Sequence, residues 1–282
     1  MKKAFVIGHP IAHSRSPLIH GHWLRKHAIV GSYERIDVHP DVLRDFIVTM
    51  RDGGFEGGNV TVPHKEATFR LLDRATERAT RLQAANTLWF EGDSLIGDNT
   101  DITGFLAHLD DSLGGDWASS ARTALVLGAG GAARAIVAGL AERGLDRIMV
   151  ANRTPEKARD LTEGTAFQEG STLEAVHWDH IERLLAESDM LVNTTSLGMV
   201  GQPPLRLALD RLPSHAVVSD IVYVPLETEL LAGARALGLR RVDGLGMLLH
   251  QAVPGFARWF GVAPKVDPEL RALIEADIAG HR

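Results

Sequence analysis

The stretch Thr123-Ala-Leu-Val-Leu127, followed by Gly128-Ala129-Gly130-Gly131-Ala132-Ala133, decides the fold of this chain. The first five residues form a short apolar run typical of a buried strand, and a helix-like segment follows the glycines. The pattern fits G-x-G-x-x-A, in which the first glycine permits a tight turn and the second lets the backbone approach a ligand closely. The small Ala133 lets the helix pack against the strand. We therefore predict a strand, a tight turn and a helix.

The same turn predicts a binding site for the phosphates of a dinucleotide. Free N–H groups and the helix dipole favour negative charge at a helix N-terminus. We expect the turn to be lined by Gly128, Ala129, Gly130, Gly131 and Ala132. Glycine-rich turns also occur for packing reasons alone. The strand before the turn, the helix after it and the strands downstream favour the dinucleotide interpretation.

The end of the next predicted strand indicates which dinucleotide is bound. NAD enzymes usually carry an acidic residue there, about 20 residues past the glycines, to bind the ribose 2′-hydroxyl. This chain has no acid at the strand end; it reads Val150-Ala151-Asn152-Arg153-Thr154-Pro155-Glu156-Lys157. A guanidinium suits a 2′-phosphate in charge and donor geometry. In a second interpretation, compatible with the first, Asn152 or Thr154 caps the helix that begins near Pro155. We predict NADP, bound here by Asn152, Arg153, Thr154 and Lys157.

Strands and helices alternate along the chain in two series, as in βαβ units. The first series has strands at 4–8, 33–38, 58–62 and 87–90, with helices at 17–27, 41–51 and 65–82. The second has strands at 123–127, 147–151, 190–193, 216–221 and 240–242, and the region 110–122 is the expected junction. The fold class is therefore α/β with two domains. An N-terminal α/β domain precedes a Rossmann-like, doubly wound domain.

Composition excludes several classes of protein. The 282 residues suggest two domains, and 45% hydrophobic with 23% charged residues is typical of globular proteins. A net charge of −6 gives no positive field for nucleic acid or membrane. The absence of cysteine excludes disulfides and thiolate chemistry and favours a reducing cytoplasm. The N-terminal apolar run ends at Gly8-His9-Pro10, too early for a signal peptide, and Arg134 and glycines interrupt the most apolar later stretch.

Polar motifs interrupt the first series of strands. In Ser14-Arg15-Ser16-Pro17, Ser16 is a natural N-cap, and the two hydroxyls also suit a carboxylate. The strand at 58–62 runs into His64 and Lys65. Amides and carboxylates recur in Ala85-Asn86-Thr87 and in Gly97-Asp98-Asn99-Thr100-Asp101. Each motif alone is ordinary turn chemistry.

Together these motifs resemble the shikimate dehydrogenase family, in the family's order and from about residue 4 to 260. The segments concerned are 14–17, 59–65, 86–87, 99–101, 128–134, 152–154, Asn193-Thr194-Thr195-Ser196-Leu197-Gly198-Met199 and Asp243-Gly244-Leu245-Gly246-Met247-Leu248-Leu249-His250-Gln251-Ala252. The resemblance implies reversible NADP-dependent reduction of 3-dehydroshikimate to shikimate. It also implies a substrate domain of residues 1–105 completed by 246–282, an NADP domain of residues 106–245, and an active site in the cleft.

The resemblance assigns a role to each site residue. Ser14 and Ser16 match positions that hold the substrate carboxylate, with Tyr223 as a third contact. Lys65 matches the proposed acid/base. Positions that bind the ring hydroxyls are matched by Asn59, Thr61, Asn86, Asp101 and Gln251. Positions lining the nicotinamide or the cleft are matched by Thr195 with its neighbours 193–196, Ile221, Gly244, Met247 and Glu77.

The residue types suit the implied reaction. Oxidation of a secondary alcohol moves a hydride to the nicotinamide and a proton to a base, so a protonatable group must reach the hydroxyl. Lys65 with Asp101 supplies a proton carrier and a partner. In the reducing direction the ammonium group can donate directly, whereas acting as a base requires it to be neutral first. We assign proton transfer to the pair and leave its order open. The reaction requires no metal, and the 13 histidines show no metal-ligand pattern.

One departure from the family's pattern bears on the substrate. The family usually has glycine after the residue matched by Asp101, whereas this chain has Ile102. A β-branched residue resists positive φ and would add bulk near the substrate, unless the backbone is extended or helical. A quinate or aminoshikimate dehydrogenase is the alternative that this opens. A regulatory protein that lost its chemistry is a third interpretation, which the presence of Lys65 and Asp101 disfavours. A homodimer and a monomer both remain open.

Overall fold

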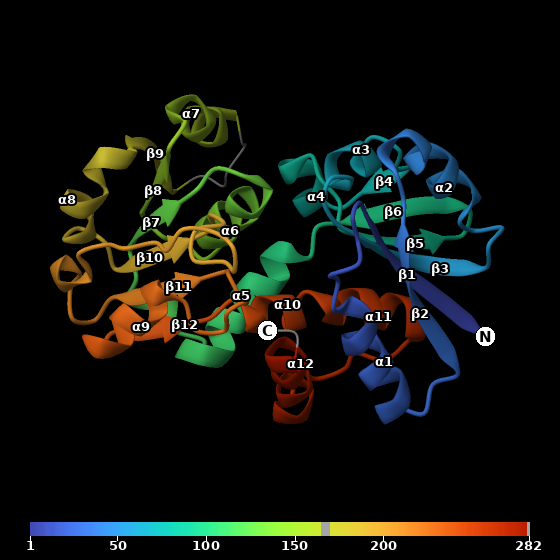
Figure 1. Ribbon diagram of the computed structural model, residues 1–282. Helices are drawn as coiled ribbons and strands as arrows, with labels where there is room; N and C mark the ends of the chain where they lie inside the picture. Colours follow the sequence, from blue (N-terminus) through green and yellow to red (C-terminus); the bar gives the residue numbers. More distant parts are fainter. Residues whose placement is uncertain (165–169, 281–282) are drawn as a thin grey trace. The chain divides into compact units, whose positions relative to one another are not determined.

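The computed structural model describes residues 1–164 and 170–280 (Figure 1). They form two compact units. The terminal unit comprises Met1–Thr100 and the chain from Leu249 onward, and the central unit comprises Asp101–Leu248. The predicted domains, 1–105 with 246–282 and 106–245, include residues 165–169 and 281–282, which lie outside the described residues. No helix in the described part is both long and apolar enough to span a membrane.

The terminal unit contains a six-stranded mixed sheet of order β2-β1-β3-β5-β6-β4. Strands β2, β1 and β3 are parallel, β5 is antiparallel to both β3 and β6, and β4 runs parallel to β6. Its strands are β1 Lys2–Gly8, β2 Gly31–Asp37, β3 Phe55–Val60, β4 Arg74–Ala75, β5 Thr87–Glu91 and β6 Ser94–Asp98. Its helices are α1 Ser16–Lys26, η1 Pro40–Val42, α2 Leu43–Thr49, α3 Lys65–Phe69, α4 Glu77–Leu82, α11 Ala252–Phe260 and α12 Pro268–Gly280.

Helices cover both faces of this sheet. Because side chains alternate along a strand, Phe5 and Ile7 point to one face, where Leu43 and Ile47 of α2 pack against them. The opposite face of β1 packs against α1 and α11. In Figure 1, α1 (blue) lies beside α11 and α12 (red), although these helices come from opposite ends of the chain. The start and the end of the chain therefore share one core.

Two local predictions in this unit are wrong. The helix predicted at 65–82 is broken into α3, β4 and α4. The break occurs because Asp73 Oδ2 accepts the Leu95 N–H at 2.7 Å, and Thr76, in extended backbone, caps α4. Ser16 is not an N-cap; it is the first residue of α1, and Arg15 precedes it as the cap residue. The Ser16 N–H instead donates to Ser14 Oγ at 3.4 Å.

The central unit contains a six-stranded sheet of order β12-β11-β10-β7-β8-β9, in which all strands are parallel. This is the order of a Rossmann-like doubly wound sheet. Its strands are β7 Thr123–Leu127, β8 Arg147–Asn152, β9 Thr172–His177, β10 Met190–Asn193, β11 Val217–Asp220 and β12 Arg240–Val242. Its helices are α5 Asp101–Leu113, η2 Trp117–Ser119, α6 Gly131–Glu142, α7 Pro155–Gly164, η3 Trp178–His180, α8 Ile181–Leu185, η4 Leu209–Arg211 and α9 Glu229–Ala236, and α10 Leu245–His250 crosses the unit boundary.

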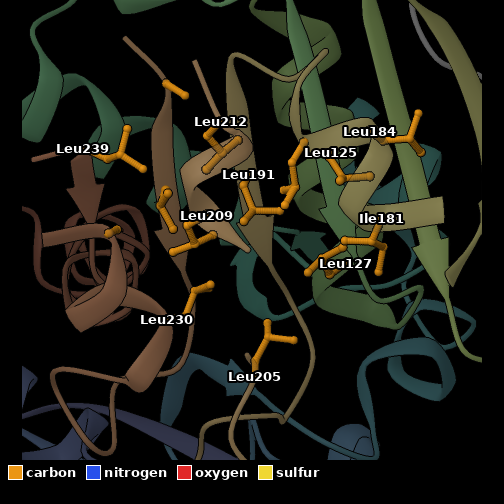
Figure 2. Packing of buried hydrophobic residues seen from close by; sticks show 14 of the residues in the cluster. Leu125, Leu127, Ile181, Leu184, Leu191, Leu205, Leu209, Leu212, Leu230 and Leu239 are labelled. Carbon is orange, nitrogen blue, oxygen red and sulfur yellow. The ribbon is translucent and has the colours of Figure 1, made fainter. Parts of the chain in front are cut away.

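Leucines dominate the core on one face of the central sheet (Figure 2). Leu125, Leu127 and Leu191 project from β7 and β10 and meet Ile181 and Leu184 of α8. Helix α6 contacts β7 and β8, and α5 packs on α6. The sheet is thus covered on both faces, as a parallel sheet requires.

Ile102 is fully buried in this packing. It lies in the first turn of α5 and has helical backbone, so positive φ is not needed. A Cβ placed on Gly139 of α6 would lie 3.5 Å from Ile102 Cγ2, which puts the Ile102 side chain against α6. Its bulk is therefore accommodated in the core of the central unit.

Candidate active site

The central unit gathers the ends of its strands at one sheet edge. The strand order reverses between β7 and β10, and ligands of doubly wound sheets bind where the order reverses, beyond the carboxyl ends of the strands. The segments after β7, β8, β10, β11 and β12 all leave from this edge because the strands are parallel. Most of the residues predicted to bind the cofactor lie in these segments.

The glycine turn after β7 has the predicted geometry. Gly128 has φ +106°, and a Cβ there would lie 2.5 Å from Thr194 Oγ1, so the turn requires glycine. Thr194 is held in place because its N–H and hydroxyl both donate to Leu127 O, at 2.9 and 2.6 Å. Gly130 is the cap residue of α6, and added Cβ atoms at Gly130 and Gly131 would meet no described atom within 4 Å. A ligand can therefore approach the backbone at the N-terminus of α6.

Two exposed cations follow β8. Asn152 Nδ2 donates to Thr154 O at 2.9 Å, which shapes the turn into α7, and Pro155 is the first residue of that helix. Arg153 and Lys157 are exposed, and neither forms an ion pair with any residue that the structure describes. This turn therefore carries positive charge, as the NADP prediction expects. The Asn152 side chain donates here, so this contact is not the acceptor contact of an N-cap.

A buried polar network fixes the turns after β10 and β11. Asp220 is fully buried; its Oδ1 accepts from Asn193 Nδ2 at 2.9 Å and from the Val222 N–H at 3.0 Å. Burial raises the pKa of Asp220, and hydrogen bonds from Thr228, Val222 and Asn193 partly oppose this. Asn193 Oδ1 in turn accepts from Thr195 Oγ1 at 2.7 Å. The 193–197 turn is thereby held on the strand edge.

Close backbone contact joins two more of the predicted cofactor residues. A Cβ on Gly244 would lie 2.2 Å from Ile221 O, so only glycine lets these two segments approach. Ile221 and Met247 are half-buried. The structure thus brings Gly128, Thr195, Ile221 and Gly244 into one set of adjoining turns.

In the terminal unit, three strands place polar residues at one edge. Asn59 near the end of β3 pairs with Thr87 at the start of β5, and Thr87 pairs with Asp98 at the end of β6. Because β5 is antiparallel to its neighbours, its beginning lies where they end. The motifs at 59–65, 86–87 and 98–101, far apart in sequence, therefore meet.

Hydrogen bonds connect these residues into a buried chain, the amide network. Asn59 Nδ2 donates to Asn86 O and to Thr87 Oγ1, each at 3.1 Å. Asn86 Oδ1 accepts from the Thr100 N–H at 2.8 Å and from Thr87 Oγ1 at 3.0 Å. Thr100 Oγ1 also donates to Gln251 O at 2.9 Å, which joins the C-terminal segment to the network. The network thus connects three of the predicted substrate residues, Asn59, Asn86 and Gln251.

The loop before α1 carries the two predicted carboxylate-binding serines. Arg35 donates to Ala12 O and Ser14 O, both at 2.7 Å, and so holds the loop on β2. Arg15 Nε pairs with Asp277 Oδ2 of α12 at 2.9 Å. Ser14 is half-buried and Ser16 is buried, so the two hydroxyls lie in an ordered segment.

Lys65 is the first residue of α3, and its carbonyl accepts the Ala85 N–H at 3.0 Å. This bond places Lys65 beside the segment that leads into Asn86. Thr61 follows β3 directly, and both Thr61 and Lys65 are half-buried. Asp101 begins α5 immediately after Thr100. Glu77 belongs to the terminal unit, where it pairs with Arg81 at 2.6 Å. Tyr223 belongs to the central unit.

Sequence reasoning missed three members of the amide network. Thr87 and Thr100 lie inside motifs that were recognised, but neither was assigned a role. Tyr33 was missed altogether, and its hydroxyl donates to Asn59 Oδ1 at 2.6 Å. Tyr33 lies in the middle of β2, and a tyrosine in a strand carries no signal beyond strand formation.

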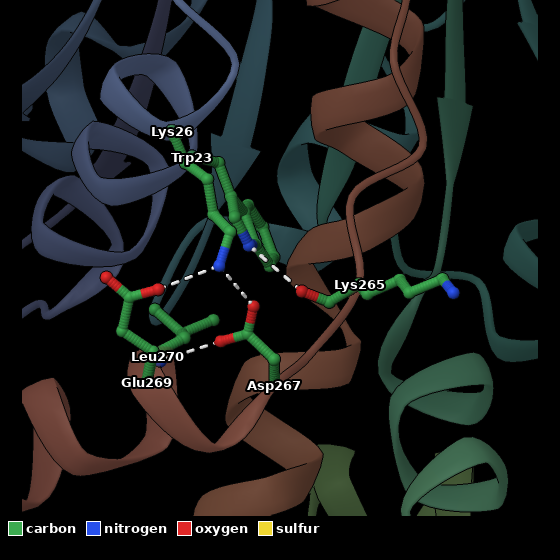
Figure 3. Close-up of polar contacts among 6 residues, drawn as sticks. All are labelled: Trp23, Lys26, Lys265, Asp267, Glu269 and Leu270. Atoms are coloured by element: carbon green, nitrogen blue, oxygen red, sulfur yellow. Dashed lines mark hydrogen bonds and ion pairs between the residues drawn. The ribbon is translucent and has the colours of Figure 1, made fainter.

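In the terminal unit, a charged cluster lies between α1 and the start of α12 (Figure 3). Potential ligand atoms, one from each residue, lie within 4.8 Å of one another in His22, Asp267 and Glu269. Lys26 Nζ, however, lies 2.7 Å from Asp267 Oδ2 and 2.8 Å from Glu269 Oε2. The ammonium group of Lys26 therefore supplies the positive charge between the carboxylates, and the cluster ties α12 to α1.

Comparison with known proteins identifies the family of this chain. Family models match at residues 6–88 (shikimate dehydrogenase substrate binding domain), 113–200 (shikimate / quinate 5-dehydrogenase) and 244–274 (shikimate 5′-dehydrogenase C-terminal domain). The chain is 61% identical over 280 residues to a shikimate dehydrogenase (NADP(+)) of Methylobacterium radiotolerans, covering 99% of this chain and 98% of that protein. It is 54% identical over 279 residues to the enzyme of the same name from Azorhizobium caulinodans, with 99% and 98% covered.

Solved structures are similar along the whole length. Shikimate 5-dehydrogenase from Thermus thermophilus, in complex with NADP(H) and shikimate, is 34% identical with a TM-score of 0.81 and 100% of both chains covered. Quinate dehydrogenase from Corynebacterium glutamicum, in complex with NAD, is 30% identical with a TM-score of 0.88, covering 98% of this chain and 100% of that one. The chain belongs to the shikimate dehydrogenase family.

Proposed function

We propose that this protein is an NADP-dependent shikimate dehydrogenase that interconverts 3-dehydroshikimate and shikimate. The observation that carries the proposal is the 61% identity, over nearly the whole chain, with a protein named shikimate dehydrogenase (NADP(+)). The two polar sheet edges supply the kinds of group that the reaction needs. We further propose a cytoplasmic location, in keeping with the absence of cysteine, and a monomer or homodimer.

The central unit would hold NADP. The backbone of Gly130 and Gly131 is accessible at the N-terminus of α6, where N–H groups favour phosphate oxygens. Arg153, with Lys157 four residues further along the chain, would bind the 2′-phosphate, and the hydrogen bond from the Asn152 amide to Thr154 O orders that turn. Thr195, Ile221, Gly244 and Met247 would line the nicotinamide. The bound cofactor supplies the hydride; the protein binds and orients it.

The terminal unit would hold the substrate. The amide network provides donors and acceptors of fixed direction, which suits the hydroxyl groups of a polyol ring. Asn59, Thr61, Asn86 and Gln251 are the residues assigned to those hydroxyls. Ser14 and Ser16, with Tyr223, are assigned to the carboxylate.

Lys65 would move the proton. In reduction, its ammonium group donates a proton to the carbonyl oxygen of 3-dehydroshikimate as the carbonyl carbon receives the hydride, and the product is the alcohol. In oxidation, neutral Lys65 accepts the hydroxyl proton. Asp101 is the assigned partner. Thr100, which precedes Asp101 in the chain, is bonded into the amide network, and this supports the assignment.

Quinate is a second candidate substrate, because the solved quinate dehydrogenase is similar in structure to this chain, with a TM-score of 0.88. Initial rates of NADP and NAD reduction, measured with shikimate and with quinate, separate the two. We expect the highest kcat/KM with shikimate and NADP. A higher kcat/KM with quinate would contradict the proposed substrate, and activity with neither acid would contradict the proposed reaction.

A further inference from the structure

Contacts with other segments fix the loop that precedes α1. The first N–H groups of a helix are often bound by the side chain of a cap residue, but α1 begins without such a bond, and its first turn carries no acidic residue. The loop closes on itself where the Ser14 N–H donates to Ile11 O at 3.0 Å. Arg35 of β2 binds it through Ala12 O and Ser14 O. The side chain of Arg15 adds a further contact.

Arg15 connects this loop to α12. Its Nε donates to Asp277 Oδ2 at 2.9 Å, across 262 residues of sequence. The pair is largely shielded from water, because 14% of the Arg15 side chain and 26% of the Asp277 side chain are exposed. Lys26 of α1 pairs with Glu269 of α12 at 2.8 Å, with 39% and 69% exposed. Since water and salt screen exposed charges, the Arg15–Asp277 pair should constrain the groups that it joins more strongly.

Helix α12 offers Asp277 a fixed position. Leu270, Ile274 and Ile278 recur every four residues along one face of the helix, and all three are buried. Asp277 lies beside this face, three residues after Ile274 and directly before Ile278. The packed helix therefore holds the Asp277 carboxylate in place, and Asp277 in turn holds the guanidinium group of Arg15.

Arg15 stands between the two serines that are assigned to the substrate carboxylate. Ser14 precedes it and Ser16 follows it, and the Ser16 N–H donates to Ser14 Oγ at 3.4 Å. A shift of the Arg15 backbone would move both serines, because each is its direct neighbour in the chain. The Arg15 carbonyl also accepts from the Leu18 and Ile19 N–H groups, at 3.0 and 3.2 Å, so the same shift would move the start of α1.

We propose that Asp277 is a positioning residue for the substrate carboxylate. By holding the Arg15 side chain, it fixes the loop that presents the hydroxyl groups of Ser14 and Ser16. The proposal rests on the proposed function, which assigns these serines to the carboxylate of a hydroxylated ring acid. Asp277 has no assigned contact with the substrate, whose like charge it would repel. Helix α12 thus contributes to substrate binding through Arg15.

The test is Asp277→Ala, which removes a partner of Arg15. We expect KM for shikimate to rise about 5–10-fold, whereas kcat and KM for NADP change little. Asp277→Asn keeps the shape and one acceptor and should give a smaller rise. In a double-mutant cycle, Asp277→Ala should have a smaller effect in the Ser16→Ala background than in wild type, because both changes weaken the same contact.

Glu269→Ala is the matched control, because Glu269 is a second carboxylate of α12 that pairs with a cation of the N-terminal segment. It should leave KM for shikimate unchanged, and thermal unfolding of both variants shows that each is folded. An equal rise in KM for Glu269→Ala and Asp277→Ala would reduce the role of Asp277 to the docking of α12, which overturns the proposal.

Two other results would also overturn it. A fall in KM for shikimate in Asp277→Ala would show that the released Arg15 binds the carboxylate itself. Additive losses with Ser16→Ala would place Asp277 outside this contact. Wild-type protein that neither binds nor oxidises shikimate would instead overturn the proposed function.

Discussion

The two sheet edges present their polar groups in different ways. At the edge of the terminal unit, Asn59, Asn86, Thr87 and Thr100 are buried and bonded to one another. At the edge of the central unit, the glycine turn exposes backbone, and Arg153 after the next strand is exposed. The first arrangement fixes the direction of each donor and acceptor, and the second offers charge and access.

The difference follows from the chemistry of the two proposed ligands. A ring hydroxyl is neutral and is distinguished from its neighbours only by where its donor and acceptor lie, so its partners must be held rigidly. A phosphate is recognised by charge and by convergent N–H groups, which tolerate small shifts of a side chain. Substitutions at the two edges should therefore fail in different ways.

The largest effect is expected at the substrate edge, from Lys65→Ala. Loss of the proton carrier should lower kcat by about 10²–10⁴-fold, with little change in shikimate affinity. Lys65→Met, which keeps the stem, should behave alike, and Lys265→Ala, an exposed lysine of the same unit, should have no effect. Steady-state kinetics and shikimate titration measure both quantities. A near-normal kcat with a large rise in KM would instead make Lys65 a binding residue.

At the cofactor edge, Arg153→Ala should raise KM for NADP far more than KM for NAD. A charge-assisted hydrogen bond is worth about 1.5–3 kcal/mol, which corresponds to about 10–150-fold. Arg183→Ala is the matched control, because Arg183 is an exposed arginine on α8 of the same unit. Kinetics with each cofactor measure the ratio. Equal losses for NADP and NAD would leave Arg153 with a structural role only.

The glycine turn allows the requirements of folding and of binding to be separated. Gly128→Ala forces a side chain to φ +106° and toward Thr194 Oγ1, so the free energy of unfolding should fall by about 1–3 kcal/mol. Gly131→Ala adds a methyl group that meets no described atom, at the first residue of α6, and should leave stability unchanged or slightly higher. It should nevertheless weaken NADP binding. Urea denaturation and cofactor titration of both variants decide whether the two glycines serve these different purposes.

Sequence reasoning succeeded where one local signal determines the structure. The strand, turn and helix around Gly128 follow from glycine conformation and apolar pattern, and the two series of strands predicted the α/β class. It failed where a tertiary contact decides. Asp73 breaks the predicted helix at 65–82 by accepting the Leu95 N–H from another strand. Strand β9 was missed because, as a half-exposed edge strand, it has no continuous apolar run.

The sequence predicted the polar motifs of the candidate site but not the hydrogen bonds that connect them. Resemblance supplied Asn59 and Asn86, yet the antiparallel β5 that brings them together could not be distinguished from a parallel strand by its sequence. The hydroxyl of Tyr33 on β2 reaches Asn59 on β3 across the intervening strand β1. A periodic sequence pattern does not predict contact between strands that are not neighbours. The bulk of Ile102 looked unfavourable near a substrate, whereas the fold turns it into the core beside Gly139.

The smallest effect is expected at the ion pairs of Lys26, which lie in the terminal unit outside the amide network. Lys26 bridges Asp267 and Glu269, and its hydrogen bonds lower the pKa of both carboxyl groups below 3.8 and 4.5, with a smaller electrostatic contribution from His22. A carboxyl group whose folded pKa is depressed stabilises the fold above its unfolded pKa, and this stabilisation disappears as pH falls through the folded value. Lys26→Met should therefore destabilise slightly at about pH 7, and the difference from wild type should shrink as the pH falls below the ordinary pKa values of the two carboxyl groups. Lys2→Met, at an exposed lysine at the start of β1, is the control. Thermal unfolding across the acidic range provides the measurement. A loss as large as that of Gly128→Ala would contradict the small effect expected here, and a loss independent of pH would show that pairing with the two carboxylates is not its cause.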